Sequence, residues 1–287
     1  KYRRMGIRTA DLLYPDILHD KIKEILAVKN EYLTKIYGER PIDPDELYNN
    51  CLRLGERLLP YIGEPEEIIA NSVSKNLSIL FEACDGVLND VDRGSYPHVM
   101  PLSSLPAAAL TGTGLRWNYP MRKIGVVKAY STRNDRGPFV TEESNAVAVF
   151  IRNRGKEFSG VSREPRRVGW LDLPAIKYAI KESGVHSLAL TKLDVLTGID
   201  EIKVCSAYDV GGEVKDVPDI AGRDMCDARP VYRTFEGWKE DLSVCRDLKN
   251  LPVQVKEYIE FIEEETGIPV IWIGLGADWG KALFIRR

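Results

Sequence analysis

The hydrophobic residues of this chain change period after a helical start, and this change limits the fold to the α/β class. From Ile17 to Tyr37, apolar residues recur every three or four positions, which predicts an amphipathic helix that Gly38 ends. Asp43 is suited to cap a second helix, with Pro44 at its first position. A shorter helix is expected from Glu66 to Lys75. The chain therefore begins with a helical region.

Past this region, short apolar runs alternate with amphipathic stretches. The expected strands are Ser78–Glu82, Lys123–Tyr130, Ser187–Thr191, Ile199–Ala207 and Pro269–Ile273, and the expected helices are Leu173–Ser183 and Pro252–Thr266. Strands that alternate with helices predict a mostly parallel sheet with helices on both faces. We therefore expect a helical region over residues 1–76, packed on an α/β region over residues 77–287 to form one integrated domain.

The composition excludes several classes of partner. Forty basic side chains stand against 43 acidic ones, so no global field attracts nucleic acid or an anionic membrane. No apolar run approaches the roughly 20 residues that a membrane span needs, and no secretory leader pattern is present. Five scattered cysteines and three histidines predict neither a disulfide framework nor a histidine-built zinc site. We expect a cytoplasmic protein without nucleic-acid or membrane partners.

The segment from Asp85 to Pro120 is rich in glycine and proline and is unusually long for a connection. Loops of this length inside compact domains are usually functional or disordered. We therefore expect this loop to be functional.

Four segments together carry a family resemblance. They are RMGIRTADL from Arg4, GVVKAYSTR from Gly125 with RGPF and TE shortly after it, PRRVGWLD from Pro165, and LTKLDVL from Leu190. In this order and spacing they resemble the adenylosuccinate synthetase family over nearly the whole chain. The resemblance implies a P-loop-like α/β fold and a ligase of AMP and purine biosynthesis. It also implies that GTP drives the joining of aspartate to inosine monophosphate, with Mg²⁺, in a homodimer.

The tetrapeptide Thr-Lys-Leu-Asp at the end of an expected strand has the chemistry of a guanine reader. The Asp194 carboxylate can accept paired hydrogen bonds from guanine N1–H and the exocyclic amino group, which adenine does not offer. The Lys192 stem can lie over the purine face with its ammonium in water. Ends of strands are also where open α/β sheets hold ligands. The alternative is an ordinary charged pair between Lys192 and Asp194.

The resemblance assigns further residues to the site. The GTP-binding residues are expected to be Arg166, Lys192, Leu193, Asp194, Gly274, Leu275 and Gly276. The substrate-binding residues are expected to be Arg4, Asp85, Met100, Val161, Ser162, Arg163, Glu164, Pro165 and Arg166. Arg4 would reach the inosine monophosphate of a partner subunit. Arg163, Arg166 and Arg167 would supply planar donors for phosphate or carboxylate, unless they form a solvated basic turn. Trp170 and Asp172 are interpreted as scaffold, with Asp172 as a helix cap.

The chain departs from the family pattern at several positions. Asp85 stands where the family has a glutamine that contacts inosine monophosphate, and Met100 stands where it has a phosphate-binding threonine. Glu164 replaces an arginine that meets the substrate, which reverses a charge. The family's phosphate loop W-G-D-E-G-K-G-K, its catalytic base and magnesium ligand, and its general-acid histidine have no counterpart here. We therefore expect no catalytic residue and no metal ligand within this chain. We also expect a fold that is incomplete at its N-terminus and needs a second segment or chain.

Two other functions stay open. The replacements Asp85, Met100 and Glu164 favour a catalytically degenerate paralogue that binds a guanine nucleotide or dimerises with an active synthetase. A related ligase that acts on a different purine nucleotide is the other alternative. Guanine nucleotide binding without ligation would indicate the paralogue, and turnover of guanosine but not inosine monophosphate would indicate the related ligase.

Overall fold

The computed structural model describes residues 4–116, 118–160, 162–216 and 224–285. The chain divides into two compact units, Lys1–Ser78 and Ile79–Arg287. This border lies two residues beyond the one expected from the sequence. The packing of the helical region on the sheet stays a prediction, and each unit is described here by itself.

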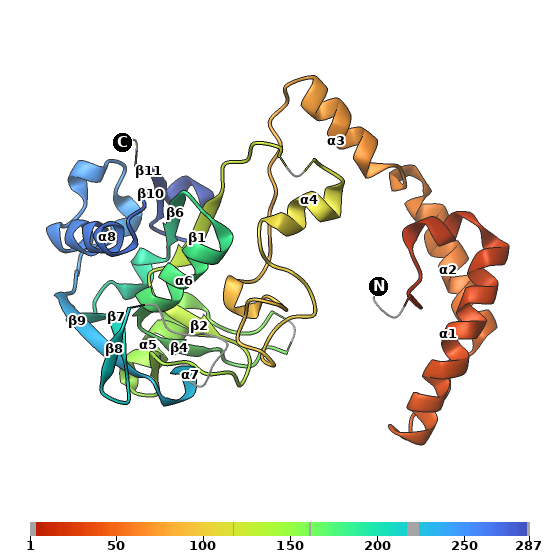
Figure 1. Cartoon of the computed structure of the whole chain (residues 1–287), viewed down its shortest axis with the longest axis horizontal. Coiled ribbons are helices and arrows are strands. Elements are labelled where there is room, and N and C mark those ends of the chain that lie inside the picture. Colours follow the sequence, from red (N-terminus) through yellow and green to blue (C-terminus); the bar gives the residue numbers. More distant parts are fainter. Residues whose placement is uncertain (1–3, 117, 161, 217–223, 286–287) are drawn as a thin grey trace. The chain divides into compact units, whose positions relative to one another are not determined.

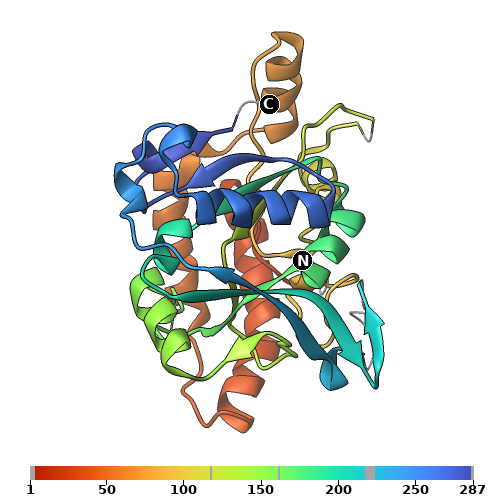
Figure 2. The same ribbon diagram turned by 90° about the vertical axis from the view of Figure 1, so that its left-hand side faces the viewer.

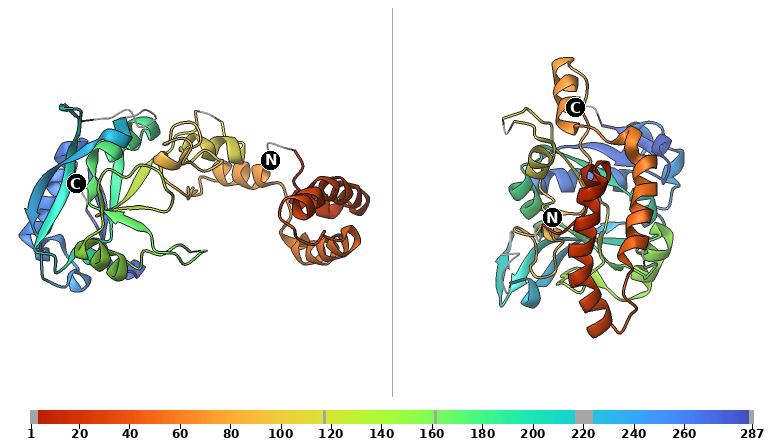
Figure 3. Two further views of the ribbon diagram at one scale, coloured as in Figure 1. Left: turned by 90° about the horizontal axis from the view of Figure 1, so that it is seen from below. Right: turned by 90° about the vertical axis from the view of Figure 1, so that its right-hand side faces the viewer.

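The first unit is helical. Its elements are η1 (Thr9–Leu13), α1 (Pro15–Lys35), α2 (Pro44–Leu58), η2 (Leu59–Tyr61) and α3 (Pro65–Ser74). Helices α1 and α2 lie side by side (Figures 1 and 3), because a stripe of Leu18, Ile22 and Leu26 on α1 is buried against α2. The Asp43 carboxylate accepts a hydrogen bond of 2.8 Å from the amide of Glu46, which confirms the predicted cap.

The central sheet of the second unit is mostly parallel. Its strands lie in the order β1 (Ile124–Lys128), β6 (Ser187–Thr191), β10 (Val270–Gly274) and β11 (Ala282–Phe284). The pairs β1–β6 and β6–β10 are parallel, and β11 runs antiparallel to β10. The first three strands were expected from their apolar runs. The chain therefore has the predicted mixed α/β fold with a mostly parallel sheet.

Two further sheets are mostly antiparallel. One contains β2 (Ser131–Arg133), β4 (Arg167–Gly169) and β3 (Glu142–Glu143). The other contains β5 (Leu171–Asp172), β7 (Glu201–Val210), β8 (Glu213–Lys215) and β9 (Arg229–Glu236). Only β5 pairs with β7 in parallel. Most of these strands have two or three residues, which is too short for a hydrophobic period to indicate them.

The helices of the second unit are α4 (Ala107–Thr113), α5 (Ala146–Gly155), α6 (Leu173–Ser183), α7 (Asp224–Asp227) and α8 (Val253–Thr266). Helices α5, α6 and α8 pack against strands β4, β7 and β9, respectively. Helix α8 packs beside α6 and β9 (Figure 2), and Tyr258 donates a buried hydrogen bond of 2.7 Å to the carbonyl of Ala129. In the part of the chain that the structure describes, no helix combines the length and the apolarity that crossing a bilayer requires.

The strand expected over Ser78–Glu82 is absent, and this prediction was wrong. The segment has no regular secondary structure, and Leu80 is 90% exposed. A strand needs a hydrogen-bonded neighbour as well as apolar residues. The segment pairs with no strand of the described residues, so its backbone stays irregular.

The long loop between residues 85 and 120 is organised around one buried carboxylate. Asp90 is 1% exposed, and it accepts hydrogen bonds from the amides of Asp92, Arg93 and Ser104 and from the hydroxyl of Ser103. Burial raises the pKa of Asp90, but these hydrogen bonds outweigh it, and the net pKa is lowered. The loop is therefore held by its own backbone and side chains from residue 90 to residue 104.

Candidate functional site

The carboxyl ends of β6 and β10 bring the expected nucleotide-binding residues together. The two strands are parallel, with Ile273 opposite Leu190, so they end at the same edge of the sheet. Strand β6 leads into Lys192–Asp194, and β10 leads into Gly274–Gly276. A Cβ atom on Gly274 would lie 3.4 Å from the Cα atom of Thr191. The two loops therefore lie side by side, at the edge where open α/β sheets hold ligands.

A left-handed turn starts the first of these loops. Lys192 has φ 62°, and the turn ends β6 and begins η4 (Leu193–Leu196). Leu193 and Leu275 are fully buried and anchor the two loops in the core. The side chains of Lys192 and Asp194 are therefore the polar groups that the β6 loop presents at this edge.

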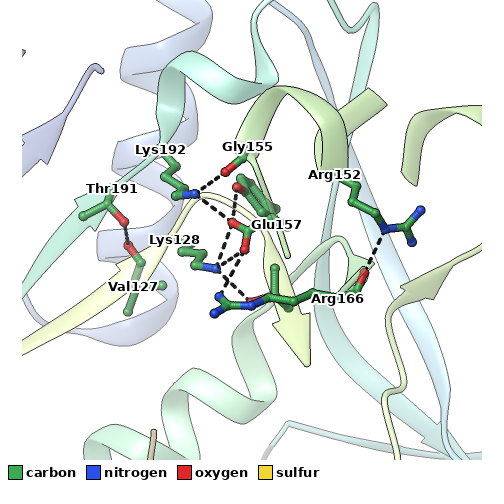
Figure 4. Close-up of polar contacts among 10 residues, drawn as sticks. Val127, Lys128, Arg152, Gly155, Glu157, Arg166, Thr191 and Lys192 are labelled. Carbon is green, nitrogen blue, oxygen red and sulfur yellow. Dashed lines mark hydrogen bonds and ion pairs between the residues drawn. The ribbon is translucent and has the colours of Figure 1, made fainter. Parts of the chain in front are cut away.

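The carboxylate of Glu157 gathers three cationic side chains beside this loop (Figure 4). Lys128 Nζ lies 2.9 Å from both of its oxygens, and Lys192 Nζ lies 2.8 Å from Oε1. Arg166 Nη1 lies 3.2 Å from Oε2, and the Tyr130 hydroxyl donates to Oε1 at 2.6 Å. We call these five residues the Glu157 cluster. Three positive charges against one negative charge leave it a net charge of +2.

The environment keeps Glu157 ionised. Burial raises the pKa of this carboxyl, but hydrogen bonds from Lys192, Tyr130 and Lys128 outweigh it and lower the pKa to about 2. Burial also lowers the pKa of the Lys128 ammonium, which Glu157 only partly offsets. Burial and the neighbouring Glu157 raise the pKa of the Tyr130 hydroxyl, so it stays a hydrogen-bond donor. Glu157 therefore stays ionised at neutral pH, and the Tyr130 hydroxyl stays its donor.

Asp194 does not pair with Lys192. The Lys192 ammonium donates to Glu157 and, at 2.6 Å, to the carbonyl of Gly155, so the alternative of a Lys192–Asp194 pair is wrong. Asp194 is half-buried, and burial raises its pKa despite the positive charges of Arg154, Lys192 and Lys281. Among the described residues, no other side chain hydrogen-bonds to its carboxylate. The arrangement leaves the Asp194 oxygens able to accept from a ligand.

The exposed turn before Arg166 contains four of the expected substrate-binding residues, Ser162, Arg163, Glu164 and Pro165. The Ser162 hydroxyl donates to Glu164 Oε2 at 3.2 Å, and the Glu164 carbonyl accepts from the amide of Ser159 at 2.8 Å. Arg163 has φ 61°, and Pro165 forms a β-bridge with Phe158. The expected residue Val161 lies outside the described part of the chain.

Arg166 connects this turn to the nucleotide side of the site. Its amide donates to the carbonyl of Glu157 at 3.0 Å, and its guanidinium reaches the Glu157 carboxylate. Arg167 does not join it. The Arg167 guanidinium makes a bidentate ion pair with Glu142 and donates to the carbonyls of Asp135 and Gly137. The expected fork of three arginines is therefore corrected, since Arg167 belongs to the scaffold.

Comparison with known proteins now decides the family. The family model described as Adenylosuccinate synthetase matches residues 1–282. The chain belongs to the adenylosuccinate synthetase family. It is 39% identical over 284 residues to the adenylosuccinate synthetase of Borrelia duttonii (strain Ly), covering 99% of this chain and 66% of that protein. It is 41% identical over 276 residues to that of Bifidobacterium longum (strain DJO10A), covering 96% of this chain and 64% of that protein.

A solved structure of the family has the same fold. The fully ligated adenylosuccinate synthetase from Plasmodium falciparum matches with a TM-score of 0.92 at 29% identity, over 99% of this chain and 67% of that one. The chain thus spans 64–66% of the length of these two curated relatives. Because the match covers only part of these relatives, it identifies the family of this chain and leaves the activity of the whole enzyme to be tested.

Asp85 and Met100, which the adenylosuccinate synthetase family pattern assigns to the substrate, are both exposed residues of the second unit. Asp85 is exposed with φ 62°, and Met100 is 41% exposed, with its amide bonded to the carbonyl of Asn89 at 2.8 Å. Arg4 is an exposed residue of the helical unit. Their roles stay predictions.

Sequence reasoning missed Glu157 and the role of Lys128. Glu157 follows α5 through the left-handed residue Lys156 and carries no motif of its own. The signal was indirect, since several cations expected at one buried edge require an anion nearby. Among the described residues, no group of three or more His, Cys, Asp or Glu side chains is arranged to hold a metal ion.

Proposed function

We propose that this chain forms the guanine-nucleotide part of a ligase that joins aspartate to inosine monophosphate at the expense of GTP. One observation carries the proposal. Lys192 is held by Glu157 and Gly155, and no other side chain of the described residues hydrogen-bonds to the neighbouring Asp194 carboxylate at the edge of the sheet. A half-buried carboxylate in this position suits the paired donors of guanine, which adenine lacks.

The proposed reaction has two steps. GTP transfers its terminal phosphoryl group to the 6-oxygen of inosine monophosphate, which turns that oxygen into a leaving group. The amine of aspartate then displaces it and forms the new C–N bond. In this chain Asp194 would select the guanine base, the Lys192 stem would lie against the purine face, and Arg166 would offset phosphate charge. No catalytic acid or base is assigned to the described residues.

Membership in the family also supports a cytoplasmic homodimer in which Arg4 serves the partner subunit. The substrate side is proposed to include Asp85, Met100 and the turn over residues 161–165. Glu164 within that turn is exposed and bonded to Ser162, so it presents a negative charge where the family pattern has a positive one.

This reversed charge favours a second candidate function. A paralogue that binds guanine nucleotides without ligating aspartate would keep the Asp194 side of the site and tolerate Glu164. Both candidate functions require guanine nucleotide binding, and they differ in turnover.

Isothermal calorimetry of the purified chain with GTP, GDP, ATP and inosine monophosphate tests the proposal. We expect GTP and GDP to bind in preference to ATP. Asp194→Asn should remove this preference, because an amide replaces one acceptor oxygen with a donor. Asp227→Asn, at an exposed position of α7, is the matched control and should bind as the wild type does. Equal binding of ATP and GTP by the wild type would contradict the proposal.

A further inference from the structure

We infer that Glu157 is a positioning residue of the proposed guanine-nucleotide site, which holds Lys192 and Arg166 in place for the base and the phosphates. The inference rests on the proposed function. Glu157 is not among the residues expected to bind nucleotide or substrate. Its role in binding is indirect, because it acts through the two cations that it holds.

The Lys192 side chain is fixed at both ends. Its backbone lies in the left-handed turn at the end of β6. Its ammonium donates to Glu157 Oε1 at 2.8 Å and to the carbonyl of Gly155 at 2.6 Å (Figure 4). Because both ends are fixed, the aliphatic stem between them has little rotamer freedom left to lose when a purine packs against it.

Glu157 holds Arg166 through hydrogen bonds to both the backbone and the side chain of Arg166. The Glu157 carbonyl accepts from the Arg166 amide at 3.0 Å, and Glu157 Oε2 accepts from Nη1 at 3.2 Å. The buried Nε of Arg166 has no hydrogen-bond partner among the described residues. Arg167 by contrast donates to a carboxylate and two carbonyls. Arg166 therefore keeps donor capacity for an anionic ligand.

The Glu157 carboxylate also reduces the repulsion between the three cations of the cluster. Lys128 and Tyr130 occupy further lone pairs of the Glu157 carboxylate and hold it between Lys192 and Arg166. Without this carboxylate, three cations would face one another in a largely buried space, and their mutual repulsion would move the flexible side chains outward. One anion thus keeps two ligand-facing cations close together and leaves the site a net positive charge for phosphate.

A purely structural role for Glu157 predicts a different result. In that case its removal would lower stability without changing which nucleotide binds. Lys177→Met separates the two roles, because it removes a largely buried ammonium that pairs with Asp216 and Glu265 and makes no bond to the Glu157 cluster. It is therefore the matched control for Glu157→Gln.

Binding of fluorescent GTP and ATP analogues to the wild type, Glu157→Gln, Glu157→Asp and Lys177→Met is the first arm of the test. We expect Glu157→Gln to weaken GTP binding about tenfold or more and to reduce the preference for GTP over ATP. Glu157→Asp should recover part of both, and Lys177→Met should lower Tm but keep the preference. An unchanged preference in Glu157→Gln with a lowered Tm would overturn the inference.

A second arm reads the position of Lys192 without nucleotide. The side-chain ammonium resonances of ¹⁵N-labelled protein, assigned with Lys192→Met, should show a protected Lys192 signal in the wild type. This signal should be lost in Glu157→Gln and kept in Lys177→Met. If the wild type binds no guanine nucleotide, the proposed function fails by itself, and this spectrum still decides whether Glu157 holds Lys192. A Lys192 signal indifferent to Glu157→Gln would overturn the positioning role.

Discussion

Lys192 Nζ lies 2.8 Å from Glu157 Oε1, although Glu157 is 35 residues away and Asp194 is two residues away. This choice of partner determines what the edge of the central sheet can do. A Lys192–Asp194 pair would have neutralised the only acidic group that the β6 loop presents to a ligand. Because a distant carboxylate takes the ammonium instead, the Asp194 oxygens can accept hydrogen bonds from a base.

Acid titration should show that Glu157 stabilises the fold. Its pKa in the folded chain, about 2, lies below its ordinary value of 4.5, so its contribution to stability is fully present above pH 4.5 and is lost as pH falls towards 2. The contribution is on the order of 3 kcal/mol. Urea unfolding of the wild type and Glu157→Gln across this window should give a gap in the free energy of unfolding that narrows as pH falls. A difference in unfolding free energy that does not change with pH would contradict a stabilising role of the ionised Glu157 carboxylate.

Asp172 should act in the opposite direction. Its pKa is raised from 3.8 to about 6, because burial outweighs the hydrogen bonds from Tyr208 and the amide of Ala175. A raised carboxyl pKa favours the folded state at low pH, and the advantage is lost as pH rises through about 6. Relative to Asp172→Asn, the wild type should lose on the order of 3 kcal/mol of unfolding free energy between about pH 4 and pH 7. Urea unfolding at the two pH values measures this loss, and its absence would contradict the assignment.

Asp90→Ala should loosen one loop and leave the sheets intact. The substitution removes the shared acceptor of four partly buried hydrogen bonds from residues 92–104, which costs roughly 0.5–1.5 kcal/mol for each bond. Amide hydrogen exchange should speed up between residues 86 and 104, whereas protection in β6 and β10 should persist. Loss of protection throughout the chain would show that Asp90 supports the whole unit instead.

Gly169→Ala should destabilise the fold through a backbone clash. A Cβ atom at this position of β4 would lie 2.2 Å from the carbonyl oxygen of Thr141, which belongs to a paired segment and cannot easily move. We expect a cost of roughly 1–3 kcal/mol and a lower Tm. Gly112→Ala in α4 is the control, because nothing lies within 4 Å and alanine favours helix, so Tm should stay equal or rise. Equal Tm values for the two variants would contradict the packing described at Gly169.

The elements that the sequence predicted carry their signals locally. Helix α6 spans the expected residues, because Asp172 caps its start and Gly184 ends it in a left-handed conformation with φ 60°. Strand β6 also matches, since a run of apolar residues between two turns is buried. The expected strand over Ser78–Glu82 failed because strand formation depends on a partner that the run itself does not specify.

The same difference between local and long-range signals applies to the residues of the candidate site. The residues at the ends of β6 and β10 could be named from a local motif and its place after a strand. Glu157 could not, because its importance comes from side chains on β1, directly before β4 and in the β6 loop, which only the folded chain brings together. Arg166 and Arg167 are adjacent in sequence, and only the structure shows that one faces the cluster and the other fixes a sheet.

If the Asp194 carboxylate accepts hydrogen bonds from both donors of guanine, then removing one of these donors from the nucleotide should weaken its binding. Inosine triphosphate provides this comparison. Inosine triphosphate keeps the N1–H and the phosphates of GTP but lacks the exocyclic amino group. The account predicts that the wild-type chain binds it about tenfold more weakly than GTP, and that Asp194→Asn removes the difference. Equal affinity of the wild type for GTP and inosine triphosphate would contradict the assignment of Asp194 as the guanine reader.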